Sequence, residues 1–353
     1  MKNKKIKLFL VIFCLIVVSN VPHIESKEMN GKIIYVDENG GKDYVTIQDA
    51  IDNSSKGDII YVYNGTYNEF LFINKSVYLI GESKEKTIIE GGNGPLVKID
   101  NFFQTNNPKN STSLINIKSD DITIKNFKIK NSSFIDKIMV YFYFKSRVCY
   151  PPNYIFQHTN IGIGISISSN NCKIVDNIIE MNGADGINLY NSDNNLISNN
   201  TIINNSFCGI YLRNSSNNCI INNTISCNGL GISFANLSFQ NILYHNNFKN
   251  NTRKHIFNDE NNTFHNKDLK HGNYWDDYNG TDKNYDGIGD KAYNLPSGKN
   301  EDKYPLVFQY HGKLIKDSYI DIETIIQILI IGVVLSIIFL LPIAYYWRKK
   351  YFR

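Results

Sequence analysis

The residues best suited to bind a metal ion form one short segment, DKNYDGIGD. Its oxygen donors follow the spacing of an EF-hand calcium loop, in which positions 1, 3, 5, 7 and 9 supply ligands and position 6 is glycine. Gly287 occupies position 6, but Tyr293 stands at position 12, where a bidentate glutamate is expected. We therefore predict weak calcium binding of the kind found in extracellular modules, with a plain turn rich in Asp and Asn as the alternative. The predicted ligands are Asp282, Asn284, Asp286, the backbone carbonyl of Ile288, and Asp290.

Carboxylates elsewhere could serve acid–base catalysis. Sugar hydrolysis requires two facing carboxylates, and Asp176, Glu180 and Asp185 lie close together in sequence. The positions 23 residues later, one repeat unit further on, carry no acid, so these carboxylates do not stack. We interpret them as solvated charges in turns, with Arg213 as an isolated arginine of the repeats. The chain is predicted not to be an enzyme, and a polysaccharide lyase, hydrolase or epimerase is the alternative. The matching positions hold Asn199, Ile203 and Cys208.

Neutral side chains offer a different chemistry, the binding of sugars. Tyr190, Tyr211 and Tyr244 lie among many asparagines, and a long face of rings and amides could hold a glycan without turnover. Sequons of the form Asn-x-Ser/Thr are frequent, and in an exported protein such sites can accept glycans. Examples are Asn64, Asn110, Asn199, Asn214 and Asn236.

A repeat of about 23 residues must position these groups. Four asparagines recur at intervals of 23 and precede short apolar stretches, and a Gly-Ile column runs beside them at intervals of 22 or 23. Such a period indicates a solenoid, and short alternating segments separated by Gly and Asn indicate strands rather than helices. We predict an all-β, right-handed parallel β-helix whose repeated asparagines form an amide ladder. The columns are Asn177, Asn200, Asn223 and Asn246, and Gly164, Gly186, Gly209 and Gly231.

The predicted β-helix covers residues 28–271. Near its beginning, a strand at Ile33–Val36 and a short helix at 46–51, capped by Thr46, precede further strands, and together they would cap the first coil. Residues 133–160 are aromatic and interrupt the period, so we expect them to leave the solenoid as a loop or flap.

Charge and cysteine content exclude some classes of protein. The net charge of +4 is modest and scattered, which argues against nucleic-acid binding. Cys14 lies in the leader; the other five cysteines are odd in number and contain no CxxC pair, so neither a disulfide framework nor a zinc site is predicted. Most of them are expected to be small buried residues. They are Cys149, Cys172, Cys208, Cys219 and Cys227.

The two ends of the chain indicate export and anchoring. Residues 1–27 combine a basic start with a short apolar run, as in a secretory signal peptide. After a linker at 311–323, residues 324–347 contain no charge and are long enough to span a bilayer. The basic tail at 348–353 then lies in the cytoplasm by the positive-inside rule. We predict a single-pass membrane protein with an extracellular β-helix.

Two segments resemble known families. YVTIQDAIDNSSKGDIIYVYNGTYNE (residues 44–69) resembles the opening of pectin-lyase-like β-helix proteins. GNYWDDYNGTDKNYDGIGDKAYNLPSGKNEDKYPL (residues 272–306) resembles the carboxy-terminal module of NosD-like proteins, which we place at 272–310 as a cap. The chain also looks like the CASH domain shared by carbohydrate-binding proteins and sugar hydrolases. The resemblance covers most of residues 32–310 and implies a surface protein of an archaeal cell.

The NosD resemblance also implies copper, because that family is named after a periplasmic protein involved in copper maturation of nitrous oxide reductase. Four histidines fall in the last coils, and imidazole is a ligand of Cu(II). Their spacing forms no HxH or HxxxH motif, so surface histidines are the simpler interpretation, and the predicted membrane anchor departs from a soluble periplasmic factor. The four are His245, His255, His265 and His271.

We therefore carry three functional hypotheses. The first is a non-catalytic cell-surface β-helix that binds or scaffolds carbohydrate or envelope partners. The second is a carbohydrate-active enzyme, and the third is a copper-handling accessory protein of the NosD type.

Overall fold

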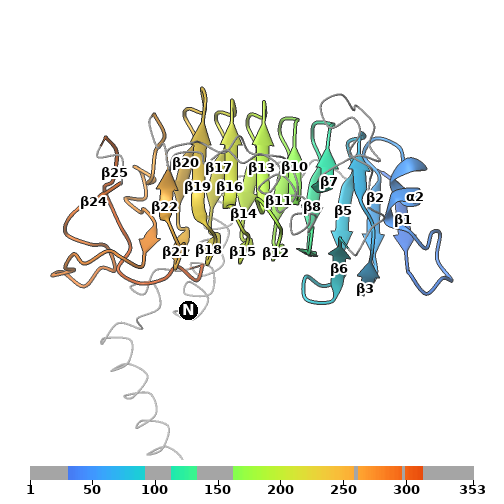
Figure 1. The fold of residues 1–353 in the computed structure, drawn as a ribbon, viewed down its shortest axis with the longest axis horizontal. Coiled ribbons are helices and arrows are strands. Elements are labelled where there is room, and N and C mark those ends of the chain that lie inside the picture. The colour runs from blue at the N-terminus through green and yellow to red at the C-terminus, as the bar shows by residue number, and fades with distance from the viewer. Residues whose placement is uncertain (1–30, 92–112, 133–161, 258–260, 296–298, 313–353) are drawn as a thin grey trace, which may run out of the picture.

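The computed structural model describes residues 31–91, 113–132, 162–257, 261–295 and 299–312. The described chain winds into a parallel β-helix in which three sheets run along the long axis of the molecule (Figure 1). Each coil adds one strand to each sheet, so the predicted all-β parallel solenoid is confirmed. Partner strands of the regular coils lie 23 residues apart, as in the pairing of Ile174 with Ile197 and of Ile197 with Ile220.

The three long sheets are named A, B and C, and a fourth is a short hairpin. Sheet A contains β1 (Ile33–Val36), β2 (Ile59–Val62), β5 (Tyr78–Gly81), β8 (Thr123–Lys125), β11 (Lys173–Val175), β14 (Leu196–Ser198), β17 (Cys219–Ile221) and β20 (Ile242–Tyr244). Sheet B contains β3 (Gly65–Tyr67), β6 (Thr87–Glu90), β9 (Lys128–Lys130), β12 (Ile178–Glu180), β15 (Thr201–Ile203), β18 (Thr224–Ser226), β21 (Asn247–Lys249) and β23 (Tyr274–Trp275). Sheet C contains β4 (Leu71–Ile73), β7 (Ser113–Ile117), β10 (Ile163–Ile167), β13 (Ile187–Tyr190), β16 (Cys208–Arg213), β19 (Leu230–Ala235) and β22 (Lys254–Phe257). The hairpin pairs β24 (Tyr293–Asn294) with β25 (Glu301–Asp302).

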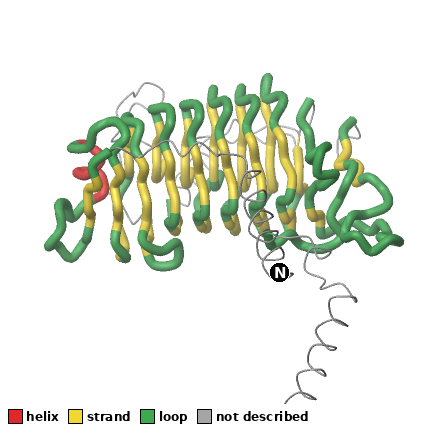
Figure 2. Tube along the Cα trace, turned by 180° about the vertical axis from the view of Figure 1, so that it is seen from behind, coloured by secondary structure: helices red, strands yellow, loops and turns green. Residues whose placement is uncertain are grey.

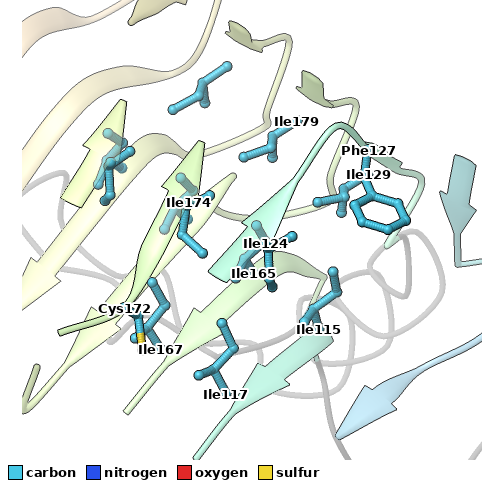
Figure 3. Close-up of a cluster of buried hydrophobic side chains, with 14 of the residues drawn as sticks. Ile115, Ile117, Ile124, Phe127, Ile129, Ile165, Ile167, Cys172, Ile174 and Ile179 are labelled. Carbon is cyan, nitrogen blue, oxygen red and sulfur yellow. The ribbon is translucent and has the colours of Figure 1, made fainter. Parts of the chain in front are cut away.

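The core is a set of stacked columns of isoleucine. Alternate residues of each strand point inward, and Ile115, Ile165 and Ile187 follow one another in sheet C with no exposed surface. Figure 3 shows such side chains from neighbouring coils meeting in the interior. Because parallel strands lie ~4.8 Å apart, each isoleucine packs on the one above it, which explains the 23-residue apolar period.

Asparagine ladders close all three corners of the coil, whereas the sequence analysis identified only one. In each ladder the side-chain Oδ1 of one asparagine accepts both the backbone N–H and the Nδ2 hydrogen of the asparagine one coil earlier. We name them by their first asparagine: the 177 ladder between sheets A and B, the 182 ladder between B and C, and the 195 ladder between C and A. Their members are Asn177, Asn200, Asn223, Asn246 and Asn273; Asn182, Asn205, Asn228 and Asn251; and Asn195, Asn218, Asn241 and Asn262.

The residue before each ladder asparagine turns the corner. Asn199, Asn204 and Asn217 have φ values of 56°, 57° and 58°, the left-handed region that asparagine tolerates better than other non-glycine residues. The doubled asparagines of the sequence therefore divide two tasks, since the first bends the backbone and the second stacks in the ladder. The turns that result are the repeated loops at the corners in Figure 2.

The glycine column has a steric cause. Gly186 and Gly209 have no positive φ. A Cβ added at Gly186 would lie 2.8 Å from the carbonyl oxygen of Gly209 and 2.9 Å from Nδ2 of Asn205 in the 182 ladder. Glycine is required there because the ladder amide fills the space that a side chain would occupy.

The first coil is capped as predicted. Helix α2 (Ile47–Asp52) begins at Thr46, whose Oγ1 accepts the backbone N–H of Asp49 at 3.2 Å. The carboxylate of Glu69 accepts the backbone N–H groups of Ile47 and Gln48 at 2.8 and 2.9 Å, which satisfies further free donors of the helix. The helix lies against the end of the solenoid beside β1 (Figure 1).

Two segments interrupt the coils without changing their register. Ile179 pairs with Ile129, and Ile115 pairs with Leu71, across 50 and 44 residues instead of 23. The predicted insertion at 133–160 and a second one at 92–112 fall in these gaps and lie outside the described residues, as do the predicted signal peptide and membrane helix. Within the described ranges, no helix is long and apolar enough to cross a membrane.

Replacing Asn200 by alanine tests the ladder. The change removes the acceptor of the Asn177 N–H at 2.9 Å and the donor to the Ile174 carbonyl at 2.8 Å. Because buried unsatisfied groups cost about 1–3 kcal/mol each, we expect the free energy of unfolding to fall by about 3 kcal/mol in denaturant titrations followed by circular dichroism. Asn199→Gly, next in sequence but exposed, is the control and should change it by less than ~0.5 kcal/mol. Equal losses in the two variants would contradict the ladder.

Candidate functional site

The 177 ladder ends on a buried carboxylate in the carboxy-terminal module. Asp302 has no exposed surface, and its Oδ2 accepts the backbone N–H of Asn273 at 2.7 Å and the indole N–H of Trp275 at 3.0 Å. Its Oδ1 accepts the backbone N–H of Tyr304 at 3.1 Å. Glycine is required at position 272 because a Cβ there would overlap Asp302 Oδ1. A carboxylate accepts hydrogen bonds and donates none. It can therefore end a column in which each asparagine donates to the side-chain oxygen one coil later.

The 182 ladder ends on a histidine. Nδ2 of Asn251 donates to the Ile225 carbonyl at 3.0 Å and lies 3.1 Å from Nδ1 of His255. The ladder bonds from Asn228 to Asn251 Oδ1 define which end of this amide is nitrogen, so Nδ1 of His255 is an acceptor. The proton of the neutral ring therefore sits on Nε2, which donates to Asp276 Oδ1 at 2.7 Å.

His255, Asp276 and Asp277 form the one group of three potential metal ligands, within the described part of the chain, whose ligand atoms lie within 4.8 Å of one another. Nε2 of His255 is 3.7 Å from Asp277 Oδ1, and Asp277 Oδ2 accepts the hydroxyl hydrogen of Tyr293 at 3.0 Å. Burial, and then the Asp277 carboxylate, raise the pKa of Tyr293 above its usual value, so the phenol remains a donor. The ring of Tyr293 stacks on Trp275 with centroids 4.5 Å apart, which fixes the group in place.

A pair of histidines, His245 and His271, lies at the corner between sheets A and B. Nε2 of His245 is 2.8 Å from Nδ1 of His271, and the ring of Tyr310 stacks on His245 with centroids 3.8 Å apart. Burial, and then the nearby charge of His271, lower the pKa of His245 to about 4. His245 is therefore neutral at neutral pH and acts as a hydrogen-bonding bridge.

The expectation of surface histidines is wrong. His245, His255 and His265 are 6%, 8% and 6% exposed, because the carboxy-terminal module folds back over the last coils and encloses them. Sequence spacing did not show this, since the residues that cover them, such as Tyr304 and Tyr310, lie far along the chain.

The predicted calcium loop forms a compact turn. Asp282 accepts the backbone N–H groups of Asp286 and Gly287 at 3.1 and 2.9 Å, and Asp286 Oδ1 accepts that of Ile288 at 2.9 Å. Gly287 has a φ of 84°, which suits the sharp bend at position 6 of a calcium loop. Asp290 turns toward Thr281 and Lys283 instead, with Oδ2 2.8 Å from Thr281 Oγ1. Nδ2 of Asn284 donates to Asp286 Oδ2 at 2.9 Å. Calcium binding at this loop stays a prediction.

The carboxylates of the regular coils do not face one another as a catalytic pair. Asp176 lies 3.3 Å from Lys125 Nζ and Glu180 lies 3.7 Å from Lys128 Nζ, each on the neighbouring coil. The interpretation of Asp185 as a solvated turn charge is wrong, because only 1% of it is exposed and its Oδ1 accepts the backbone N–H of Cys208 at 3.0 Å. Of the described cysteines, Cys172 and Cys208 are buried, Cys219 and Cys227 are half-buried, and all four are free.

The three tyrosines do not form one glycan-binding face. Tyr190 is 45% exposed at the end of β13, with the Arg213 guanidinium 5.5 Å above its ring, whereas Tyr211 is 8% exposed. Tyr244 lies on sheet A. The exposed neutral groups instead gather along the corner between sheets C and A, where one amide per coil projects outward from a left-handed residue. We call this column the amide ridge; its residues are Asn171, Asn194, Asn217, Gln240 and Asn261.

The sequence profile of one family, described as "Periplasmic copper-binding protein (NosD)", matches residues 51–280. The chain belongs to the NosD family. The comparison with curated proteins gave no match. The NosD profile ends within the carboxy-terminal module and includes the three ladders up to Asn273.

Solved structures share the fold at low identity. Pectin methylesterase from carrot is 12% identical with a TM-score of 0.36, and the match covers 63% of this chain and 64% of that one. The enzyme from Aspergillus niger is 16% identical with a TM-score of 0.37, covering 63% and 68%. ORF18 of Geobacillus virus E2 is 19% identical with a TM-score of 0.38, covering 61% and 41%. This chain thus spans less than two thirds of the carrot enzyme.

Copper, which the family name implies, does not fit the described donors as they stand. A metal at Nε2 of His255 would need the proton moved to Nδ1, which would then face the amide hydrogens of Asn251. The facing nitrogens of His245 and His271 already bond to each other. The half-buried thiol of Cys219 lies on β17, whereas that of Cys227 lies in the turn after β18, at a different corner of the coil. The facing nitrogens of His245 and His271 and both ring nitrogens of His255 are thus engaged in hydrogen bonds. Nε2 of His265 is buried without a hydrogen-bond partner among the described residues, but one nitrogen supplies only one ligand.

The buried carboxylate predicts a pH dependence of stability. Burial raises the pKa of Asp302 to about 7, against the opposing effect of its N–H donors, from an ordinary value of 3.8. The folded chain therefore binds the proton more tightly than the unfolded chain, and stability falls as pH rises from about 4 to about 7. In Asp302→Asn, which cannot titrate, we expect this loss, on the order of 3–4 kcal/mol, to disappear from denaturant titrations at pH 4 to 8. An identical pH profile in both proteins would contradict the shift.

Proposed function

We propose that this NosD-family chain is a non-catalytic β-helix of the cell surface that binds or scaffolds carbohydrate or other envelope partners. The observation that carries the proposal is the amide ridge. Its side chains project one per coil, each both donates and accepts hydrogen bonds, and sugar hydroxyls have the same dual character. An array of neutral groups with a ~4.8 Å repeat suits a hydroxyl-rich chain lying along the solenoid.

The state of the ionisable groups supports binding rather than turnover. In the described coils, Asp176 and Glu180 pair with lysines of the neighbouring coil, and Asp185 is buried against backbone. Two carboxylates facing an open space, as glycoside hydrolysis requires, are not formed by these residues.

The cellular placement rests on sequence segments outside the described residues. The apolar runs within 1–27 and 324–347 support export and a single membrane anchor, which would hold the β-helix outside the cell with residues 348–353 in the cytoplasm. At that location the partners within reach are polysaccharides and envelope proteins.

Binding without turnover is the expected outcome for the full-length chain. Purified protein applied to an array of microbial and plant oligosaccharides should retain at least one class of glycan. Incubation with the retained glycan should release neither reducing ends nor unsaturated sugar, because Asp176, Glu180 and Asp185 form no facing pair. Release of either product would favour the carbohydrate-active enzyme instead.

We also propose that the loop from Asp282 to Asp290 binds Ca²⁺ weakly. With a Kd near 1 mM, 10 mM Ca²⁺ stabilises the folded state by roughly 1.4 kcal/mol, which corresponds to a rise in melting temperature of about 2–4 °C. We expect this rise in thermal melting of the full-length chain, and expect it to be lost in Asp286→Ala, which removes the ligand oxygen at position 5. Equal concentrations of Mg²⁺ serve as the control, and an unchanged melting temperature at 10 mM Ca²⁺ would exclude the site.

A further inference from the structure

The amide ridge ends at a cleft between the last corner of the solenoid and the carboxy-terminal module. The cleft has a volume of about 680 Å³, within the ~300–1,000 Å³ range of ligand sites. One wall comes from two successive turns between sheets C and A, and the other comes from the segment after β24. Its lining residues are Phe239, Gln240, Asn261, Asn262, Thr263, Lys299 and Asn300.

The floor of the cleft is rigid. Asn262 closes the 195 ladder, where its Oδ1 accepts the backbone N–H and the Nδ2 hydrogen of Asn241 at 3.0 and 2.9 Å, and its Nδ2 donates to the Ser238 carbonyl at 3.0 Å. Nδ2 of Asn300 donates to the carbonyl oxygen of Asn262 at 2.6 Å and joins the second wall to the first. The opening is therefore held at a fixed width by the same interaction that stacks the coils.

The rim carries polar groups whose hydrogen-bonding capacity is unused. Within the described part of the chain, the side chains of Gln240, Asn261 and Thr263 make no intramolecular hydrogen bond. Gln240 and Asn261 have φ values of 57° and 59°, so the left-handed backbone directs both amides away from the coil. Phe239 is 36% exposed and its ring contacts no other aromatic ring of the described residues.

The chemistry of these groups selects the ligand. Two amides and a hydroxyl both donate and accept, so they match hydroxyl groups better than a bare ion of either sign. Lys299 is the one charged side chain among the lining residues described. An exposed ring beside polar groups is an apolar platform for the C–H face of a sugar ring. We propose that the cleft is a saccharide-binding site for a neutral, hydroxyl-rich oligosaccharide.

This assignment rests on the proposed function and narrows it from the side of the solenoid to one end. The remainder of the amide ridge then contributes less than the cleft, because Asp193 and Ser216 stand beside Asn194 and Asn217 at the positions that correspond to Phe239. Affinity should depend on Phe239 and Gln240.

The test uses the full-length chain and two sources of saccharide, an array of neutral and acidic oligosaccharides and the polysaccharide extracted from the envelope of the producing cells. Dissociation constants are then measured by calorimetry for the retained glycan. We expect Phe239→Ala and Gln240→Gly each to weaken binding about tenfold, because each removes one contact worth ~1.4 kcal/mol. Glycine at position 240 removes the amide without straining a positive φ.

Asn217→Gly makes the same change on the amide ridge one coil before the cleft, at a φ of 58°, and should weaken binding less than Gln240→Gly. The matched control is Asn204→Gly, an exposed asparagine with a φ of 57° at the corner between sheets B and C, outside both the amide ridge and the cleft. It should leave both affinity and melting temperature unchanged. If the wild-type chain binds a glycan and the cleft variants bind it equally well, or if Asn217→Gly weakens binding as much as Gln240→Gly, the cleft is not the site, although the proposed function stands. If the wild-type chain retains no saccharide from either source, both fall.

Discussion

One pair of hydrogen bonds, from the backbone N–H and the side-chain Nδ2 of an asparagine to the side-chain carbonyl of the asparagine one coil further on, determines the shape of this molecule. A coil that turns three corners buries backbone N–H groups where no strand can pair them, and an unpaired buried donor is costly. The ladders supply the missing acceptors at every corner. Two other features of the regular coils follow from the ladders. The left-handed residue before the ladder asparagine turns the chain so that the amide points into the column, and the glycine column beside sheet C leaves space for the amide.

Much of the fold could be predicted because the ladder is strictly periodic. The column from Asn177 to Asn246 could be predicted because it recurs at intervals of 23 beside apolar segments. The same interval relates Asn182 to Asn205 and Asn195 to Asn218, which the sequence analysis did not identify. The ladder ends could not be predicted in this way. Asn273 and Asp302 follow after 27 and 29 residues, so periodicity no longer marks them.

The sites divide along the same line. The predicted calcium loop is local, and its spacing could be recognised in the sequence. The burial of the histidines and the cleft are non-local, because Phe239 and Asn300 meet only after the module folds back over the last coil. The same folding back explains why His245 and His255, which were expected at the surface, are buried and hydrogen-bonded at the end of the solenoid.

The ladders also have a direction. In the 177 ladder each side-chain oxygen accepts only from the coil before it, so the column begins at the backbone N–H of Phe127, which donates to Asn177, and finishes on the acceptor oxygens of Asp302. Any whole number of coils fits between a starting donor and a final acceptor, because each asparagine supplies both functions. A gene for such a rod can gain or lose 23 codons at a time and still encode matching ends, whereas a fraction of a coil would set donor against donor. The length of the solenoid is thus free to vary in steps of one coil while one terminal module serves every length.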